Sequence, residues 1–163
     1  MFGFPNPVNE VAARTVAAGV AVLCAVTLVL SAALGTGWLW LTAVLAYGFV
    51  ARVLTGPTLS PLGRVATQVV APRLGHEKPV AGPPKRFAQG IGATLSVAAV
   101  VLHFGFAADT AALVLVAAVL VAATLESVWA LCLGCRIFAA LMRVGLVPEE
   151  TCAACADISL RIA

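Results

Sequence analysis

Four of the five cysteines in this 163-residue chain form two Cys-x-x-Cys motifs toward its C-terminus. The motifs are Cys132–Cys135 and Cys152–Cys155, and the remaining Cys24 lies in a long apolar run. Two cysteines at this spacing can form a small disulfide ring, and a thiolate of such a pair attacks other disulfides. The motifs therefore indicate thiol–disulfide or sulfur exchange. We expect Cys24 to be a small apolar filler.

The same four cysteines also suit a metal. Sixteen residues separate the two motifs, which is a spacing found in four-cysteine zinc sites. An iron–sulfur cluster would use the same ligands, namely Cys132, Cys135, Cys152 and Cys155. The segment 136–151 is largely apolar, unlike the turn-rich knuckles of zinc ribbons. A metal site stays open beside exchange, and no other cofactor is predicted.

Glu126 is the other candidate for chemistry, because it lies inside an apolar run shortly before Cys132. A carboxyl group within a bilayer is costly and usually faces the protein interior or water. Thiol exchange requires proton movement, so Glu126 is a candidate proton carrier. On an unbroken helix Glu126 would point away from Cys135, and Cys132 would lie toward the helix C-terminus, where the dipole opposes a thiolate.

A third alternative is a small permease for a sulfur compound, which would need a polar path through the membrane. Glu126 and seven hydroxyl residues could contribute to such a path: Thr27, Ser31, Thr42, Thr94, Ser96, Thr124 and Ser127. Nothing in their spacing shows that they converge.

The composition places this chemistry in a membrane. Hydrophobic residues make up 62% of the chain and charged residues 10%, with a mean hydropathy of +1.06. Soluble domains are about 45–50% apolar and about 25% charged. A soluble fold of this size would lack the polar residues to cover its surface. We therefore expect an all-α integral membrane protein.

Four apolar segments are each long enough to cross a bilayer. The predicted spans are about 15–34, 38–54, 87–106 and 110–136. Breaks at 35–37 and 107–109 would arrange them as two hairpins, and Asn9 is a good N-cap for the first helix. Residues 1–144 thus form a four-helix transmembrane domain, and residues 145–163 form a tail that contains the second cysteine pair.

The basic residues predict the orientation. All ten flank the spans on one side or lie in the central loop and the tail: Arg14, Arg52, Arg64, Arg73, Lys78, Lys85, Arg86, Arg136, Arg143 and Arg161. The two short turns carry none. The positive-inside rule then places both termini in the cytoplasm, where transient thiol chemistry or metal binding is more common than structural disulfides. No basic run with interleaved aromatic residues indicates nucleic-acid binding.

The central loop contains a further pattern. Apolar residues recur at helical spacing between Leu62 and Val70, and Arg64, Thr67 and Gln68 fall on the opposite side. This pattern predicts a short amphipathic helix on the inner membrane surface, opened by Pro61 and closed by Pro72. A loop packed beneath the bundle is the alternative.

Several segments together resemble one family. They are Phe4-Pro5-Asn6-Pro7-Val8-Asn9-Glu10, Gly56-Pro57 through Ser60-Pro61, Pro83-Pro84-Lys85-Arg86-Phe87-Ala88 and Cys132-Leu133-Gly134-Cys135. The chain is similar over nearly its whole length to an uncharacterised bacterial membrane family, domain of unknown function 4395. The resemblance implies a bacterial plasma membrane. It also implies a soluble thioredoxin-like or rhodanese-like partner, because genes for such proteins often neighbour those of the family.

Overall fold

The computed structural model describes residues 7–75 and 79–148, in which four helical segments are long and apolar enough to span a membrane. The spans are α1 (Glu10–Leu34), the 3₁₀ helix η1 (Thr36–Trp40) continued by α2 (Leu41–Thr55), α5 (Gly82–Phe106) and α6 (Asp109–Trp129). The predicted all-α class with four candidate spans is therefore confirmed.

The surface of this bundle is apolar. In each span, the most apolar window has at most 39% of its residues buried inside the protein. Val22 and Val29 on α1, for example, each expose 64% of their surface. Exposed apolar area on this scale is unfavourable in water and favourable in lipid. The chain thus has the character of a multi-pass membrane protein.

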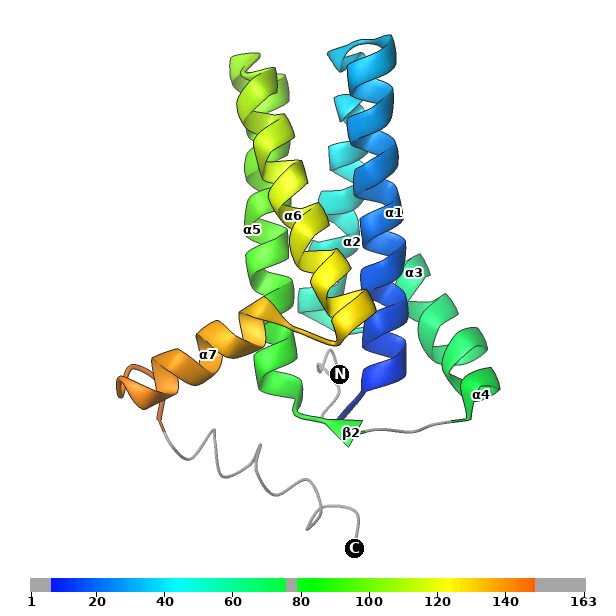
Figure 1. The fold of residues 1–163 in the computed structure, drawn as a ribbon, viewed down its shortest axis with the longest axis vertical. Helices are drawn as coiled ribbons and strands as arrows, with labels where there is room; N and C mark the ends of the chain where they lie inside the picture. The colour runs from blue at the N-terminus through cyan, green and yellow to red at the C-terminus, as the bar shows by residue number, and fades with distance from the viewer. Residues whose placement is uncertain (1–6, 76–78, 149–163) are drawn as a thin grey trace, which may run out of the picture.

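The helices pack within the pair α5 and α6 and also across the two predicted hairpins. Helix α1 packs most extensively on α6, α2 packs on α5, and α5 packs on α6 (Figure 1). The buried residues at the centre include Cys24, Leu39, Ala99 and Val116. Cys24 is fully buried in this core, so the neighbouring helices enclose it. Helices α1 and α2 are joined by a tight turn but contact each other much less than they contact α6 and α5.

The remaining elements lie at one end of the bundle (Figure 1). Strands β1 (Val8–Asn9) and β2 (Pro79–Val80) pair antiparallel and tie the start of α1 to the segment before α5. Sequence periodicity gave no sign of this ribbon. Helix α7 (Leu133–Arg143) leaves the bundle at an angle and packs on the first turns of α5, where Phe87 and Phe138 have ring centroids 5.5 Å apart.

The central loop forms three consecutive helical segments: α3 (Pro61–Val65), the π-helix η2 (Ala66–Val70) and α4 (Ala71–Leu74). The Ser60 side chain accepts from the backbone N–H of Gly63 at 3.3 Å and caps the first of them. Pro72 does not close the helix as expected. It lies in the first turn of α4, directly after the wide π-turn, which leaves room for a ring that lacks an N–H.

The helix starts follow local chemistry. Asn9 caps α1 as predicted, with its Oδ1 accepting from the N–H of Val11 at 2.9 Å. Helix α5 begins at Gly82, earlier than the predicted residue 87, because Pro83 and Pro84 occupy its first turn instead of breaking it. The earlier start makes Lys85 a helical residue of α5.

The largest departure from the predicted spans is at the end of α6. The predicted helix continued to about residue 136, whereas α6 ends at Trp129 and a new helix begins at Leu133. Ala130 has a left-handed backbone, with φ of 55°. The N–H groups of Ala130 and Leu131 both bond the carbonyl of Leu125, which is the usual hydrogen bonding at a helix C-terminus. Glycine usually occupies this position, so an alanine gave no sign of the break.

The contact between α2 and α5 makes a first prediction. A Cβ atom added at Gly92 would overlap the ring of Phe49, whereas a Cβ at Gly90 would meet nothing within 4 Å. We expect Gly92→Ala to destabilise the protein by about 1–3 kcal/mol. Gly90 is two residues earlier and lies on the opposite side of the same helix. Gly90→Ala should therefore leave the free energy of unfolding unchanged or raise it slightly. Thermal unfolding of detergent-purified variants measures both, and equal losses would contradict the packing described here.

Candidate functional site

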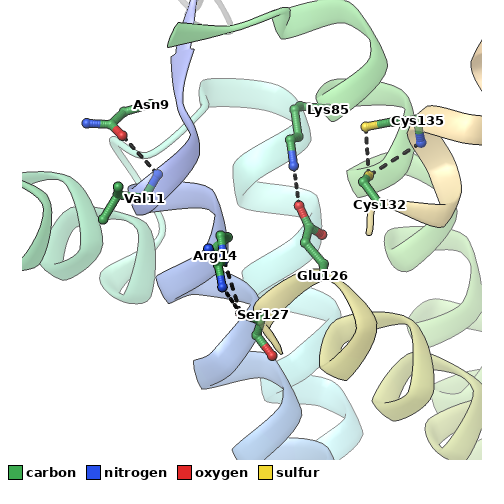
Figure 2. Close-up of polar contacts among 8 residues, drawn as sticks. All are labelled: Asn9, Val11, Arg14, Lys85, Glu126, Ser127, Cys132 and Cys135. Atoms are coloured by element: carbon green, nitrogen blue, oxygen red, sulfur yellow. Dashed lines mark hydrogen bonds and ion pairs between the residues drawn. The ribbon is translucent and has the colours of Figure 1, made fainter. Parts of the chain in front are cut away.

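The end of α6 is held by a residue distant in sequence. Arg14 on α1 donates from Nε and Nη2 to the carbonyl of Ser127, at 3.1 and 2.9 Å, and from Nη2 to the carbonyl of Val128 at 3.1 Å. A cation at the negative end of a helix dipole is stabilising, and these bonds satisfy carbonyls that the helix leaves free. Arg14 therefore stabilises the break that separates Glu126 from the cysteines (Figure 2).

This break reverses the electrostatic environment expected for Cys132. On one continuous helix the residue would lie near a C-terminus, but Cys132 is the N-cap of α7. Its sulfur accepts from the backbone N–H of Cys135 at 3.4 Å, in the manner of a capping oxygen. The positive end of the α7 dipole thus favours a thiolate at Cys132, contrary to the expectation from sequence.

The two sulfurs of this motif lie side by side. Cys135 Sγ is 2.7 Å from Cys132 Sγ and donates a hydrogen bond to it. That bond, assisted by the nearby Lys85 charge, lowers the pKa of the Cys132 thiol below its ordinary value despite partial burial and the Glu126 carboxylate. The same bond and burial raise the pKa of Cys135. Cys132 is therefore the more acidic thiol of the pair.

Glu126 and Lys85 form an ion pair beside the cysteines (Figure 2). The Lys85 Nζ donates to Glu126 Oε1 at 2.5 Å, and the two side chains are 11% and 14% exposed. Sequence reasoning selected Glu126 but not Lys85. The charges of both residues act on Cys132, with Lys85 favouring the thiolate and Glu126 opposing it. In the sequence Lys85 lies two residues before the predicted span, among the other basic residues of the central loop, so nothing distinguished it.

Two hollows meet at Cys132. An open hollow of about 530 Å³ is lined by Lys85, Cys132, Cys135 and Arg136, among others. A second cavity of about 270 Å³ extends between the helices and is lined mostly by apolar side chains, with Gln89, Glu126 and Cys132 as polar or reactive members. Cys132 itself is only 8% exposed. A reactant therefore reaches its sulfur through one of these hollows.

A buried arginine that sequence reasoning also missed lies at the same end. Arg52 on α2 is 5% exposed, and its Nε donates to Gln89 Oε1 at 2.9 Å. Its Nη1 donates to Ser60 Oγ at 3.3 Å, and its guanidinium carbon lies 4.6 Å from the centroid of the Phe49 ring. An arginine at the end of an apolar span ordinarily extends to the interface, so its burial could not be read from the sequence.

The second cysteine pair, Cys152 and Cys155, lies outside the described residues, so the structure does not place it relative to Cys132 and Cys135. Within 7–75 and 79–148, no three His, Cys, Asp or Glu residues gather in a group that could hold a metal ion. Two thiolates on one tetrahedral zinc would lie about 3.8 Å apart, given Zn–S bonds of about 2.3 Å. Cys132 Sγ and Cys135 Sγ lie closer together than that, at 2.7 Å.

The hydroxyls considered for a permease path mostly bond within their own helices. Six of the seven donate to carbonyls three or four residues earlier: Thr27, Thr42, Thr94, Ser96, Thr124 and Ser127. Ser31 Oγ is buried and has no partner among the described residues. Hydroxyls bonded in this way offer few free groups to a permeating solute.

A family model described as domain of unknown function (DUF4395) matches residues 8–143. No curated protein and no protein of solved structure matches the chain. The match includes Lys85, Glu126, Cys132 and Cys135 and ends before Cys152. The resemblance inferred from the sequence segments is thereby confirmed, and the membrane-boundary cysteine pair falls inside the family domain.

The opposite charges of Lys85 and Glu126 should have opposite effects on the reactivity of the Cys132 sulfur. Lys85→Met removes the cation that favours the Cys132 thiolate, so alkylation of Cys132 by iodoacetamide at pH 7 should slow several-fold. Glu126→Gln removes the opposing carboxylate, so the same reaction should accelerate. Mass spectrometry of the Cys132 peptide gives both rates. Arg64→Gln, an exposed change at the same end of the bundle, is the control, and slowing in both site variants would contradict an electrostatic effect.

Proposed function

We propose that this chain, which belongs to the DUF4395 family, is a membrane-embedded thiol–disulfide or sulfur-exchange protein that acts through Cys132 and Cys135. One observation carries the proposal: the Cys132 sulfur caps α7 and accepts bonds from both the N–H and the thiol of Cys135. A stabilised thiolate beside a protonated thiol is the arrangement that disulfide exchange requires. Both sulfurs border the open hollow, which gives a partner access.

The proposed reaction has two steps. The Cys132 thiolate attacks one sulfur of a partner disulfide, forms a mixed disulfide and releases the partner's other sulfur as a thiolate. Cys135 then loses its proton and attacks Cys132, closing the intramolecular disulfide and releasing the second partner thiolate. Two electrons pass from the cysteine pair to the partner, and the proton of Cys135 ends on a released thiolate. With a persulfide R–S–SH as the sulfane-sulfur donor, the Cys132 thiolate attacks the outer sulfur, the donor S–S bond breaks, and the donor leaves as the thiol R–SH while Cys132 carries the persulfide.

Glu126 has the role of proton carrier in this scheme. Thiol exchange moves protons at each step, and Glu126 lies beside the pair, held by Lys85. Lys85 stabilises the negative charge on Cys132 before the attack. The Cys132 sulfur is neutral in the mixed disulfide, so it no longer attracts the Lys85 ammonium. Lys85 then interacts with the Glu126 carboxylate alone.

We place this end of the bundle in the cytoplasm of a bacterial cell. Eight of the ten basic residues lie in the described segments, and all eight are at the end that carries α3, α4 and α7. The positive-inside rule assigns that end to the cytoplasm, and both termini with it. The segment 61–74 would then lie as an interfacial helix on the inner membrane surface.

The proposed partner is a soluble thioredoxin-like or rhodanese-like protein that docks at the open hollow. Cys152 and Cys155, in the cytoplasmic tail, are proposed as a second pair that exchanges with the first. Electrons would then pass between the partner, the tail pair and the pair at the membrane boundary.

A trapping experiment tests the proposed order of attack. Cys135→Ser removes the resolving thiol, so a mixed disulfide at Cys132 should accumulate when the protein meets oxidised thioredoxin or a disulfide dye. Cys132→Ser should trap little, since the nucleophile is gone. Non-reducing gels and mass spectrometry read the adduct, with Cys24→Ser as the matched control because that cysteine is buried in the core.

The same material separates the alternatives. Equal trapping in the two site variants would contradict distinct roles for Cys132 and Cys135. One equivalent of zinc or iron in anaerobically purified protein, with four protected thiols, would replace exchange with a metal centre.

A further inference from the structure

We propose that Arg52, with Lys85 and Gln89, forms a binding site for a single oxyanion at the charged end of the bundle. A cavity of about 190 Å³ lies between the start of α1, the end of α2, the loop helices and the first turns of α5. Arg52, Lys85, Gln89, Asn9 and Thr67 supply its polar lining. This site is separate from the sulfurs, which do not line the cavity, and the inference goes beyond the proposed function.

The first argument is hydrogen bonding. Arg52 is only 5% exposed, and it donates hydrogen bonds from Nε to Gln89 and from Nη1 to Ser60. Its Nη2 is buried and has no hydrogen-bond partner among the described residues. A buried donor left unpaired costs about 1–3 kcal/mol, and more when the group is charged. Nη2 therefore keeps an unpaired donor on a guanidinium whose side chain lines the cavity.

The second argument is charge. The partners of Arg52 are a neutral amide, a hydroxyl and the face of the Phe49 ring. Glu126 is paired with Lys85, so it cannot fully compensate both cations. At this end the described residues include eight cations and only two carboxylates, Glu10 and Glu126. A water molecule would satisfy Nη2 but would bring no charge, whereas an anion supplies both.

The third argument is chemistry. Nη2 is the arm of the planar guanidinium fork that Gln89 and Ser60 leave free, so it can donate to one oxygen of an anion, and the nearby Lys85 ammonium adds charge without fixed geometry. The pair suits a sulfate or phosphate group, and the cavity has room for one with a few waters. The phosphate group has two possible sources: a free anion from the cytoplasm or the headgroup of an anionic lipid, since the cavity lies where the spans end.

The test uses the full chain in nanodiscs of phosphatidylcholine, with radiolabelled sulfate and phosphate as probes. We expect wild type to bind one anion per chain, and Arg52→Gln to lose at least about tenfold in affinity, which corresponds to about 1.4 kcal/mol. Arg64→Gln removes an exposed arginine at the same end and should bind as wild type does. Anion binding by Arg52→Gln equal to that of wild type would overturn the proposal.

A second arm identifies the source of the anion. Nanodiscs that contain phosphatidylglycerol should weaken sulfate binding to wild type if a lipid headgroup occupies the site, and should leave it unchanged if the ligand is free. Should Arg52→Gln fold poorly, Arg52→Lys keeps the charge but loses the fork. The sulfate-dependent rise in Tm, compared with chloride at equal ionic strength, should then be smaller than in wild type, and an equal rise would overturn the proposal.

A negative result for the anion site can be told apart from a negative result for the proposed thiol exchange. The double variant Cys132→Ser, Cys135→Ser should bind sulfate like wild type, because neither sulfur lines the cavity. Anion binding with no trapping at Cys132 would support this site alone, whereas trapping without anion binding would support exchange alone.

Discussion

The bond between Arg14 and the last carbonyls of α6 is the interaction on which the cysteine site depends. It satisfies a helix end that would otherwise continue, and the chain turns at Ala130 and starts again at Leu133. Without that turn, Cys132 would be a residue inside a longer helix, opposed by its dipole. With it, the same sulfur faces the positive end of α7. A single long-range contact thus stabilises the break that places this thiol at the start of a second helix.

Three cations at one end of the bundle are each held by partners inside the protein. Arg14 donates to helix carbonyls, and Lys85 forms an ion pair with Glu126. Arg52 contacts neutral hydrogen-bond acceptors and the face of the Phe49 ring. Each arrangement lowers the cost of holding a cation near the membrane boundary by a different means. Helices that end at the interface bring these groups together, whereas the opposite end consists of short turns without Arg or Lys.

Periodicity and composition predicted the four spans and the Asn9 cap, because those features depend on local sequence. The break after Trp129 was missed, since its left-handed residue is an alanine and the bonds that hold it come from α1. The loop helix was predicted to end at Pro72 and the third span to begin at residue 87, after Pro83 and Pro84, although prolines fit the first turn of a helix. Lys85 and Arg52 were missed for a related reason: Glu126 and Gln89, to which they donate, are each more than thirty positions away. Only the three-dimensional packing reveals such pairs.

Helix α7 carries both sulfurs in its first turn and contacts the bundle mainly through α5. Gly134 and Phe138 are buried in that contact, while Ile137 and Arg143 face outward. Any tilt of α7 against α5 therefore changes the position of the sulfurs relative to Lys85 and Glu126. The distances from both sulfurs to the ion pair of Lys85 and Glu126 are therefore fixed by how α7 is seated on α5.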